Sequence, residues 1–111
     1  MFSAQVIRKA ARDYPKLLRS TTDKFLTEAG IVVQRDAKEL VPVDTGNLKG
    51  SITHRVDGNA AIVGTNVEYA EHVEYGTVRS QAKPYMRPAI DANRRKLIKR
   101  FAQMIKAMIR G

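Results

Sequence analysis

One triplet in this sequence has the composition of a catalytic motif. Asp44-Thr45-Gly46 follows the largely apolar segment Val41–Val43, and aspartic proteases also present an Asp-Thr-Gly triplet after apolar residues. In those enzymes two aspartates share one proton, and one of them activates a water molecule. The context favours another role, because Pro42 ends a predicted helix and an aspartate beyond it suits a cap or turn. We therefore expect a turn at Asp44, with the protease as the alternative.

The two histidines, His54 and His72, are the next candidates for chemistry. The His-Glu-x-x-His spacing of zinc enzymes is absent, so a metal site would need a further ligand from elsewhere in the chain. The absence of cysteine excludes disulfides and thiolate ligands. Because no phosphate-cradling glycine pattern is present either, we expect no metal and no cofactor. We interpret three carboxylates as solvated or as partners for basic residues of a neighbouring subunit: Glu68, Glu71 and Glu74.

The positive charge of the chain is concentrated at its C-terminal end. The net charge is +9, and residues 87–111 hold eight basic residues against Asp91 alone. Such a block can contact nucleic acid or an acidic protein surface, although a solvated helix face is the simpler interpretation. The candidate contact residues are Arg94, Arg95, Lys99 and Arg100. The tyrosines at 69, 75 and 85 are not interleaved with lysine or arginine, so we expect packing or interface contacts rather than base stacking.

Residues 1–40 are predicted to be helical. Apolar residues recur at steps of three and four, and Asp36 is the poor fit in this pattern. Pro15 predicts a break at Tyr14–Pro15, because proline removes a helical hydrogen bond. Gly30 weakens the helix by about 1 kcal/mol without ending it. The predicted stripe contains Leu18, Thr22, Phe25, Ala29, Val32 and Leu40, and it is widened by Val33 and Ala37.

Residues 41–86 are predicted to form a small antiparallel sheet with turns around it. Segments 51–56 and 60–65 have the composition of strands, and Asp57-Gly58-Asn59 between them is a hairpin turn signal. A short helix is expected over 66–75. Gly76 would cap that helix, and the residues up to 86 would form a loop, with a short third strand as an option.

Residues 87–111 are predicted to form a basic C-terminal helix, with Pro88 in its first turn. Its apolar stripe is expected to pack on the sheet or on the N-terminal helix. The stripe contains Ile90, Leu97, Phe101, Met104, Ile105 and Met108. The predicted fold is therefore α+β in a single domain of residues 1–111: a long N-terminal helix, a small antiparallel β-sheet with a hairpin, a short helix, and a C-terminal helix packed on the sheet.

Three blocks of the chain resemble the neck, or tail-component, proteins of long-tailed bacteriophages. Val41–Ile52 is similar to their Pro-x-Asp-Thr-Gly-x-Leu-(Arg/Lys)-x-Ser-Ile signature, and Val63–Thr77 to Val-Gly-x-x-x-x-Tyr-Ala-x-x-(Val/Leu)-Glu-x-Gly-Thr. Lys83–Ala89 is similar to Pro-Phe-(Met/Leu)-Arg-Pro-Ala, with Tyr85 for the usual Phe. The blocks occur in the family's order. The structural motif positions are Pro42, Asp44, Thr45, Gly46, Leu48, Ile52, Gly64, Tyr69, Ala70, Glu74, Gly76, Pro84, Tyr85, Arg87 and Pro88.

The resemblance implies an α+β fold and assembly of a homo-oligomeric ring, hexameric or dodecameric, below the portal. The implied partners are the phage adaptor or stopper and the tail-terminator protein. The implied location is the head–tail junction of the virion, after assembly in the host cytoplasm. The family is not associated with catalysis. We expect Gly46, Gly64 and Gly76 to fix turns and close approaches of the backbone.

Three functions follow from these observations. A structural head–tail joining protein is the favoured one. A basic protein that binds DNA through residues 94–110 is the second, although no helix-turn-helix pattern supports it. The protease built on Asp44 is the third. No apolar run approaches the roughly 20 residues that span a bilayer, so no membrane contact is expected.

Overall fold

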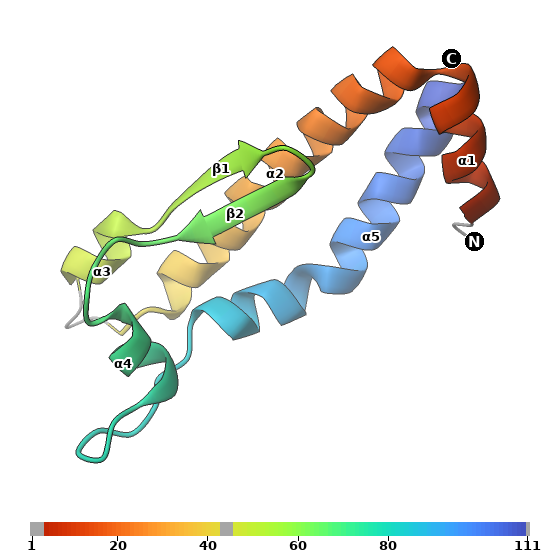
Figure 1. Ribbon diagram of the computed structural model, residues 1–111. Coiled ribbons are helices and arrows are strands. Elements are labelled where there is room, and N and C mark those ends of the chain that lie inside the picture. The colour runs from red at the N-terminus through yellow and green to blue at the C-terminus, as the bar shows by residue number, and fades with distance from the viewer. Residues whose placement is uncertain (1–3, 43–45, 111) are drawn as a thin grey trace.

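The computed structural model, which describes residues 4–42 and 46–110, has the predicted α+β class. Both the β-hairpin and the last helix pack against the long second helix, which is therefore the central element (Figure 1). The molecule is elongated, with extents of 55 × 24 × 19 Å. In chain order the elements are α1 (Ala4–Asp13), α2 (Pro15–Leu40), α3 (Gly46–Ser51), β1 (Thr53–Asp57), β2 (Ala60–Gly64), α4 (Ala70–Tyr75) and α5 (Met86–Arg110).

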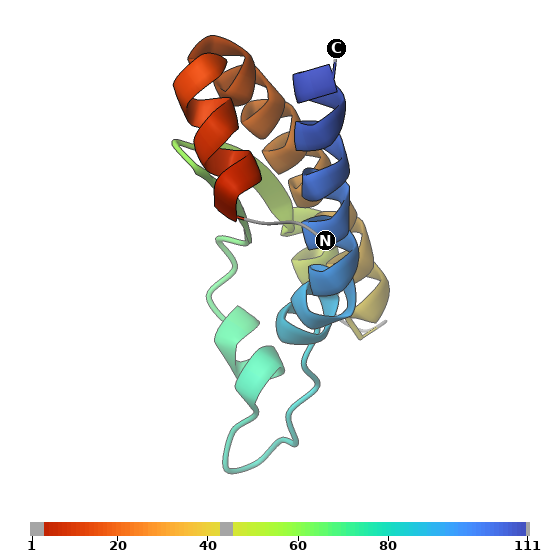
Figure 2. The same cartoon turned by 90° about the vertical axis from the view of Figure 1, so that its right-hand side faces the viewer.

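The break predicted at Tyr14–Pro15 separates α1 from α2. Tyr14 lies outside helical geometry, with φ −136° and ψ 56°, and Pro15 begins α2. Proline is tolerated there because the first amides of a helix have no carbonyl partner within it. The Tyr14 N–H still donates to the Ala10 carbonyl over 2.9 Å. The break turns α1 back beside α2 and α5 (Figure 2).

The buried face of α2 differs in part from the predicted stripe. Ala29 is buried as expected, but Phe25 and Val32 are only half-buried and Leu40 is exposed. The reason is that α2 packs against two elements, the hairpin and α5, so its covered surface is wider than a single stripe. Val33 and Ala37, expected to widen the stripe, are buried; the other buried residues of α2 are Leu26, Ala29 and Gly30.

Asp36, the poor fit in the apolar pattern, has a polar partner on α5. The Nδ2 group of Asn93 donates to Oδ2 of Asp36 over 2.7 Å and to the carbonyl of Ala89 over 2.7 Å. Asn93 is only 4% exposed, and its hydrogen bonds satisfy its buried amide. The hydrogen bond from Asn93 is the main reason why the pKa of the Asp36 carboxyl is lowered. The fold therefore favours the ionised form of Asp36.

The predicted hairpin is present and lies on α2. Its strands pair antiparallel, with His54 opposite Val63, and Gly58 in the turn has φ +59°, as primed hairpin turns require. Nδ1 of His54 is hydrogen-bonded to Oε1 of Gln34 on α2. A Cβ atom at Gly30 would lie 2.9 Å from Cδ2 of His54, so glycine lets the sheet approach α2 closely. Within residues 4–42 and 46–110 the sheet has two strands, and the optional third strand is not formed.

Helix α5 packs mainly on α2, the second of the two surfaces expected for it. Ile105 is fully buried, but Ile90 is 42% exposed, so its predicted place in the buried stripe is wrong. The helix bends along its length, and its two halves therefore turn different sides towards α2 (Figure 1). Phe101 is half-buried, and its ring lies against Phe25 with the ring centroids 4.7 Å apart.

Candidate functional site

Residues from all three sequence blocks meet in one hydrophobic cluster beside the C-terminal end of α2. Leu48 and Ile52 come from the first block, Ala70 from the second and Tyr85 from the third. Leu48 is fully buried and Ile52 is 2% exposed. The blocks are separated in sequence, so packing of α3, α4 and α5 around α2 is what brings them together. We call this group the motif cluster; its buried members are Val33, Ala37, Val41, Leu48, Ile52, Ala70, Tyr85 and Ala89.

Tyr85 is the largest buried side chain of the motif cluster, and it is far less exposed than Tyr69 and Tyr75, the other two tyrosines of the blocks. It is 3% exposed, whereas Tyr69 is 38% and Tyr75 is 68% exposed. Burial raises the pKa of the Tyr85 hydroxyl, and the negative charge of Glu74 adds to this effect. The packing role expected for the tyrosines therefore holds for Tyr85, while the other two remain available at the surface.

Glu74 caps the N-terminus of α5. Its Oε1 accepts hydrogen bonds from the backbone N–H of Tyr85 over 3.1 Å and of Met86 over 2.9 Å, and its Oε2 accepts one from Arg87 over 3.3 Å. The first amides of a helix have no carbonyl partner within the helix, and the helix dipole favours a negative charge there. The interpretation of Glu74 as a solvated carboxylate is therefore wrong. Sequence reasoning missed this cap because Glu74 precedes the helix by eleven residues or more.

Gly76 ends α4 as predicted. Its φ is +78°, and its N–H donates to the His72 carbonyl over 2.8 Å. A Cβ atom at this position would lie 2.7 Å from the backbone nitrogen of Ala82, because the loop folds back against the helix end. Gly64 has no positive φ, and among residues 4–42 and 46–110 no atom outside the neighbouring residues lies within 4 Å of a Cβ built at Gly46 or Gly64, so the close approach expected at these two glycines is not found there.

Replacement of Gly76 by alanine is expected to lower the free energy of unfolding by about 1–2 kcal/mol. Alanine is disfavoured at positive φ by this amount, and the backbone of Ala82 cannot move away cheaply. Urea unfolding followed by circular dichroism measures the effect. Gly50→Ala is the matched control, because it lies in α3 with open space around it and should be neutral or stabilising. Equal destabilisation by both variants would contradict the role given to Gly76.

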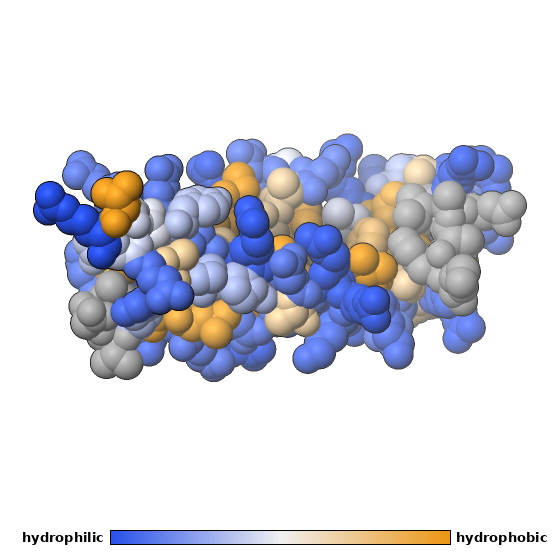
Figure 3. Space-filling view, turned by 90° about the horizontal axis from the view of Figure 1, so that it is seen from below, coloured by the Kyte–Doolittle hydropathy of each residue, from blue (hydrophilic) through white to orange (hydrophobic). Residues whose placement is uncertain are grey.

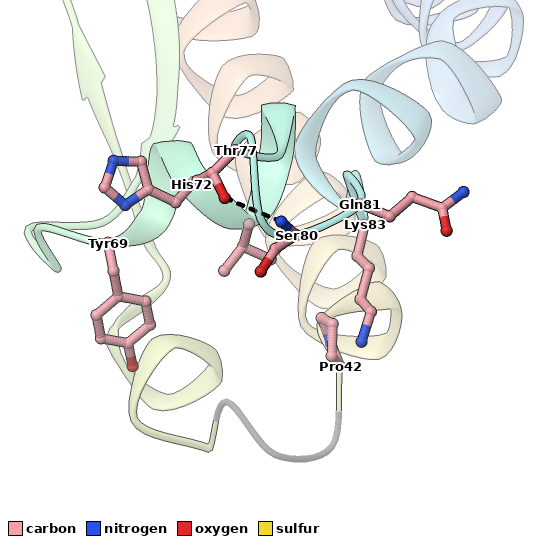
Figure 4. A pocket seen from close by; sticks show the side chains of 8 residues that line it. Pro42, Tyr69, His72, Thr77, Ser80, Gln81 and Lys83 are labelled. Atoms are coloured by element: carbon pink, nitrogen blue, oxygen red, sulfur yellow. Dashed lines mark hydrogen bonds between the residues drawn. The ribbon is translucent and has the colours of Figure 1, made fainter.

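A shallow pocket of about 310 Å³ lies between α4, the following loop and Pro42 (Figure 4). Its wall is stabilised by the backbone N–H of Ser80, which donates to Oγ1 of Thr77 over 3.0 Å. The side chains of Tyr69, His72 and Lys83 lie apart from one another and do not converge on one point (Figure 4). In residues 4–42 and 46–110 no group of three or more histidine, aspartate or glutamate side chains is placed to hold a metal ion.

The four basic contact candidates on α5 fall into two pairs. Arg94 forms an ion pair with Asp91 over 3.3 Å, and Nε of Arg100 contacts Oε2 of Glu28 over 3.1 Å. The hydrogen bond from Arg100 lowers the pKa of the Glu28 carboxyl. The other pair, Arg95 and Lys99, is exposed and forms no ion pair within the described part of the chain.

The remaining motif residues have varied positions. Pro42 is half-buried at the end of α2, and Pro88 is half-buried in the first turn of α5. Pro84 and Arg87 are exposed. Asp44 and Thr45 lie outside the described residues, so the turn predicted there stays a prediction.

The first block, and the second block except for its last residue Thr77, also fall within a match to a family model. The model described as "Bacteriophage HK97-gp10, putative tail-component" matches residues 4–76, from the start of α1 to the cap of α4. The chain belongs to the HK97-gp10-like family. This confirms the resemblance to phage tail-component proteins, although the third block, Lys83–Ala89, lies beyond the matched residues. No curated protein and no solved structure matches the chain.

Membership of the HK97-gp10-like family supports a structural role in a bacteriophage, in which the protein interacts with other structural proteins of the particle. None of the helices described between residues 4 and 110 is both long enough and apolar enough to cross a membrane. The motif cluster gives the three blocks a shared structural role, because each block contributes to the same packed junction of four helices.

Proposed function

We propose that the protein is a structural head–tail joining component of a tailed bacteriophage. Its membership of the HK97-gp10-like family carries this proposal. In this role it forms a ring, hexameric or dodecameric, between the portal with its adaptor and the tail. Its neighbours are other copies of the chain, the adaptor or stopper, and the tail-terminator protein. It acts at the head–tail junction of the virion, without catalysis and without a cofactor.

The distribution of side chains supports a role based on contacts. The motif residues Leu48, Glu74 and Tyr85 are used for packing and capping inside the fold. Several apolar side chains remain at the surface, with Val78 fully exposed and Ile98 55% exposed. On the face seen in Figure 3 such apolar patches are separated by charged and polar side chains, as in interfaces with a polar rim.

Deletion of the gene from the phage that encodes the protein tests the proposed role. We expect DNA-filled heads and complete tails that are not joined, seen by negative-stain electron microscopy of the lysate. Wild-type protein supplied from a plasmid should restore joined particles. Normal infectious particles without the protein would contradict any essential role in joining. Failure to form tails at all would place the protein in tail assembly instead.

DNA binding through residues 94–110 is the second candidate, because Arg95 and Lys99 are exposed and form no ion pair in the described chain. A protein with this function binds duplex DNA with an affinity that falls steeply as salt is raised. A gel-shift titration at two salt concentrations separates it from the joining role. If the wild type binds DNA strongly and an Arg95→Gln/Lys99→Gln variant loses this binding but still supports joining, the second function is favoured.

A further inference from the structure

Helix α5 carries two like-charge pairs that we call the basic stripe: Arg95 with Lys99, and Lys106 with Arg110. These residues lie on one side of the helix because their spacing follows its period of about 3.6 residues. Ala102 lies on the same side between Lys99 and Lys106 and is buried, so the stripe consists of two separate pairs. The stripe residues are exposed, apart from the half-buried Lys106. None of them takes part in the ion pairs found within residues 4–42 and 46–110.

Within a single chain the basic stripe is unfavourable. Arg95 with Lys99, and Lys106 with Arg110, are like-charge pairs one helical turn apart, which repel each other. A surface of opposite charge would remove this repulsion and gain favourable contacts. Because Arg94 and Arg100 already have carboxylate partners in the fold, the stripe, together with the exposed Arg87 and Lys96, is available to an external partner.

A complementary surface is present at the other end of the same chain. A hollow of about 390 Å³ lies between the segment after β2, α4 and the start of α5. Glu68 and Glu71 are exposed on its lining, and neither forms an ion pair in the part of the chain that the structure describes. Tyr75, also on the lining, is 68% exposed and offers a ring against which the alkyl stem of a lysine or arginine can pack. We call this the acidic hollow.

The shape of the molecule keeps the two surfaces apart. α4 lies near one end of the 55 Å long molecule, whereas the last turns of α5 lie at the other end, beside α1 (Figure 1). They therefore do not meet within one chain but can meet between copies. A contact between two different surfaces of identical chains is heterologous, and it closes into a ring when the rotation between neighbours allows.

We propose that the basic stripe of one copy docks on the acidic hollow of the next copy in a head-to-tail contact. This inference rests on the ring assembly proposed above and names the surfaces that form it. Duplex DNA would also attract the stripe. A second copy is the better occupant because its charge complements the stripe and because DNA binding would leave the exposed Glu68 and Glu71 without a role.

Two charge-reversed variants of the full chain test the contact. One carries Glu68→Lys and Glu71→Lys, and the other carries Arg95→Glu and Lys99→Glu. Each variant alone places like charges against each other, so it is expected to associate at least about 100-fold more weakly than the wild type in sedimentation velocity at low salt. An equimolar mixture of the two again places opposite charges at every contact, and it should recover assembly.

The matched control is Lys9→Glu with Lys16→Glu, which reverses two exposed charges on α1 and α2 and should assemble like the wild type. If the wild type assembles and both charge-reversed variants assemble equally well, the docking contact is wrong while the ring proposal stands. A wild-type protein that stays monomeric at all concentrations and with neck partners overturns both. Loss of salt-sensitive DNA affinity in the Arg95→Glu/Lys99→Glu variant, without recovery in the mixture, identifies DNA as the occupant and overturns the contact.

Discussion

Tyr85→Ala is expected to lower the free energy of unfolding by about 3–5 kcal/mol, the range for removal of a buried aromatic ring. The ring is 3% exposed and lies among Leu48, Ile52 and Ala70, so the truncation leaves a cavity between elements that all three blocks build. A domain is held together by only about 5–15 kcal/mol. The variant should therefore be close to unfolding at physiological temperature. Urea unfolding at a fixed protein concentration measures the loss.

Tyr75→Ala is the matched control for this prediction. Tyr75 is the same residue type in the same part of the molecule, but it is 68% exposed, so its truncation should change the free energy of unfolding by about 0.5 kcal/mol or less. Tyr85→Phe keeps the ring and should be nearly neutral, in agreement with the phenylalanine that is usual at this place in the resembled motif. A Tyr85→Ala variant as stable as Tyr75→Ala would show that the motif cluster does not hold the fold together.

Glu74→Ala is expected to lower the free energy of unfolding by about 2 kcal/mol. The substitution removes the acceptor for the amides of Tyr85, Met86 and Arg87, and hydrogen bonds to a charged group contribute about 1.5–3 kcal/mol. The amides of Tyr85 and Met86 are only partly accessible to replacement water, since Tyr85 is buried and Met86 is half-buried. Thermal unfolding followed at 222 nm measures the change.

Glu71→Ala removes a carboxylate from the same helix without removing a cap. Glu71 is exposed, so its truncation should change stability by about 0.5 kcal/mol or less. Glu74→Gln keeps an oxygen that can accept part of the hydrogen bonds and should fall between the wild type and Glu74→Ala. If Glu71→Ala and Glu74→Ala have the same effect, the capping geometry does not contribute to stability.

These variants separate folding from assembly. Variants at Tyr85 and Glu74 should impair joining through loss of the folded protein, and lower temperature should partly restore joining. Charge reversals at Glu68 and Glu71 should leave the midpoint of the unfolding transition unchanged and impair joining at every temperature. Glu68, Glu71 and Glu74 all lie in the second block, so this contrast would show that one block contributes both to the fold and to its outer surface.

Several features of the fold were predictable because they depend on residues close together in sequence. Pro15 breaks the helix whatever the tertiary contacts of the helix are, because the missing N–H and the steric clash of the proline ring are local effects. Gly58 in the hairpin turn and Gly76 at the end of α4 adopt positive φ for equally local reasons. Alternation and helical periodicity then indicated the order of the elements. The α+β class and the family resemblance follow from these signals together.

Other features were decided only by the tertiary structure, because they join residues that are distant in sequence. Glu74 caps a helix that begins later in the chain, and Asp36 is bonded to Asn93 fifty-seven positions away. Ile90 is exposed because the buried face of the first turns of α5 runs through Ala89 and Asn93, which the apolar pattern did not indicate. A sequence pattern shows which side chains are apolar or charged, but the choice of partner depends on how α2, α4 and α5 pack, and that packing is determined by contacts throughout the chain.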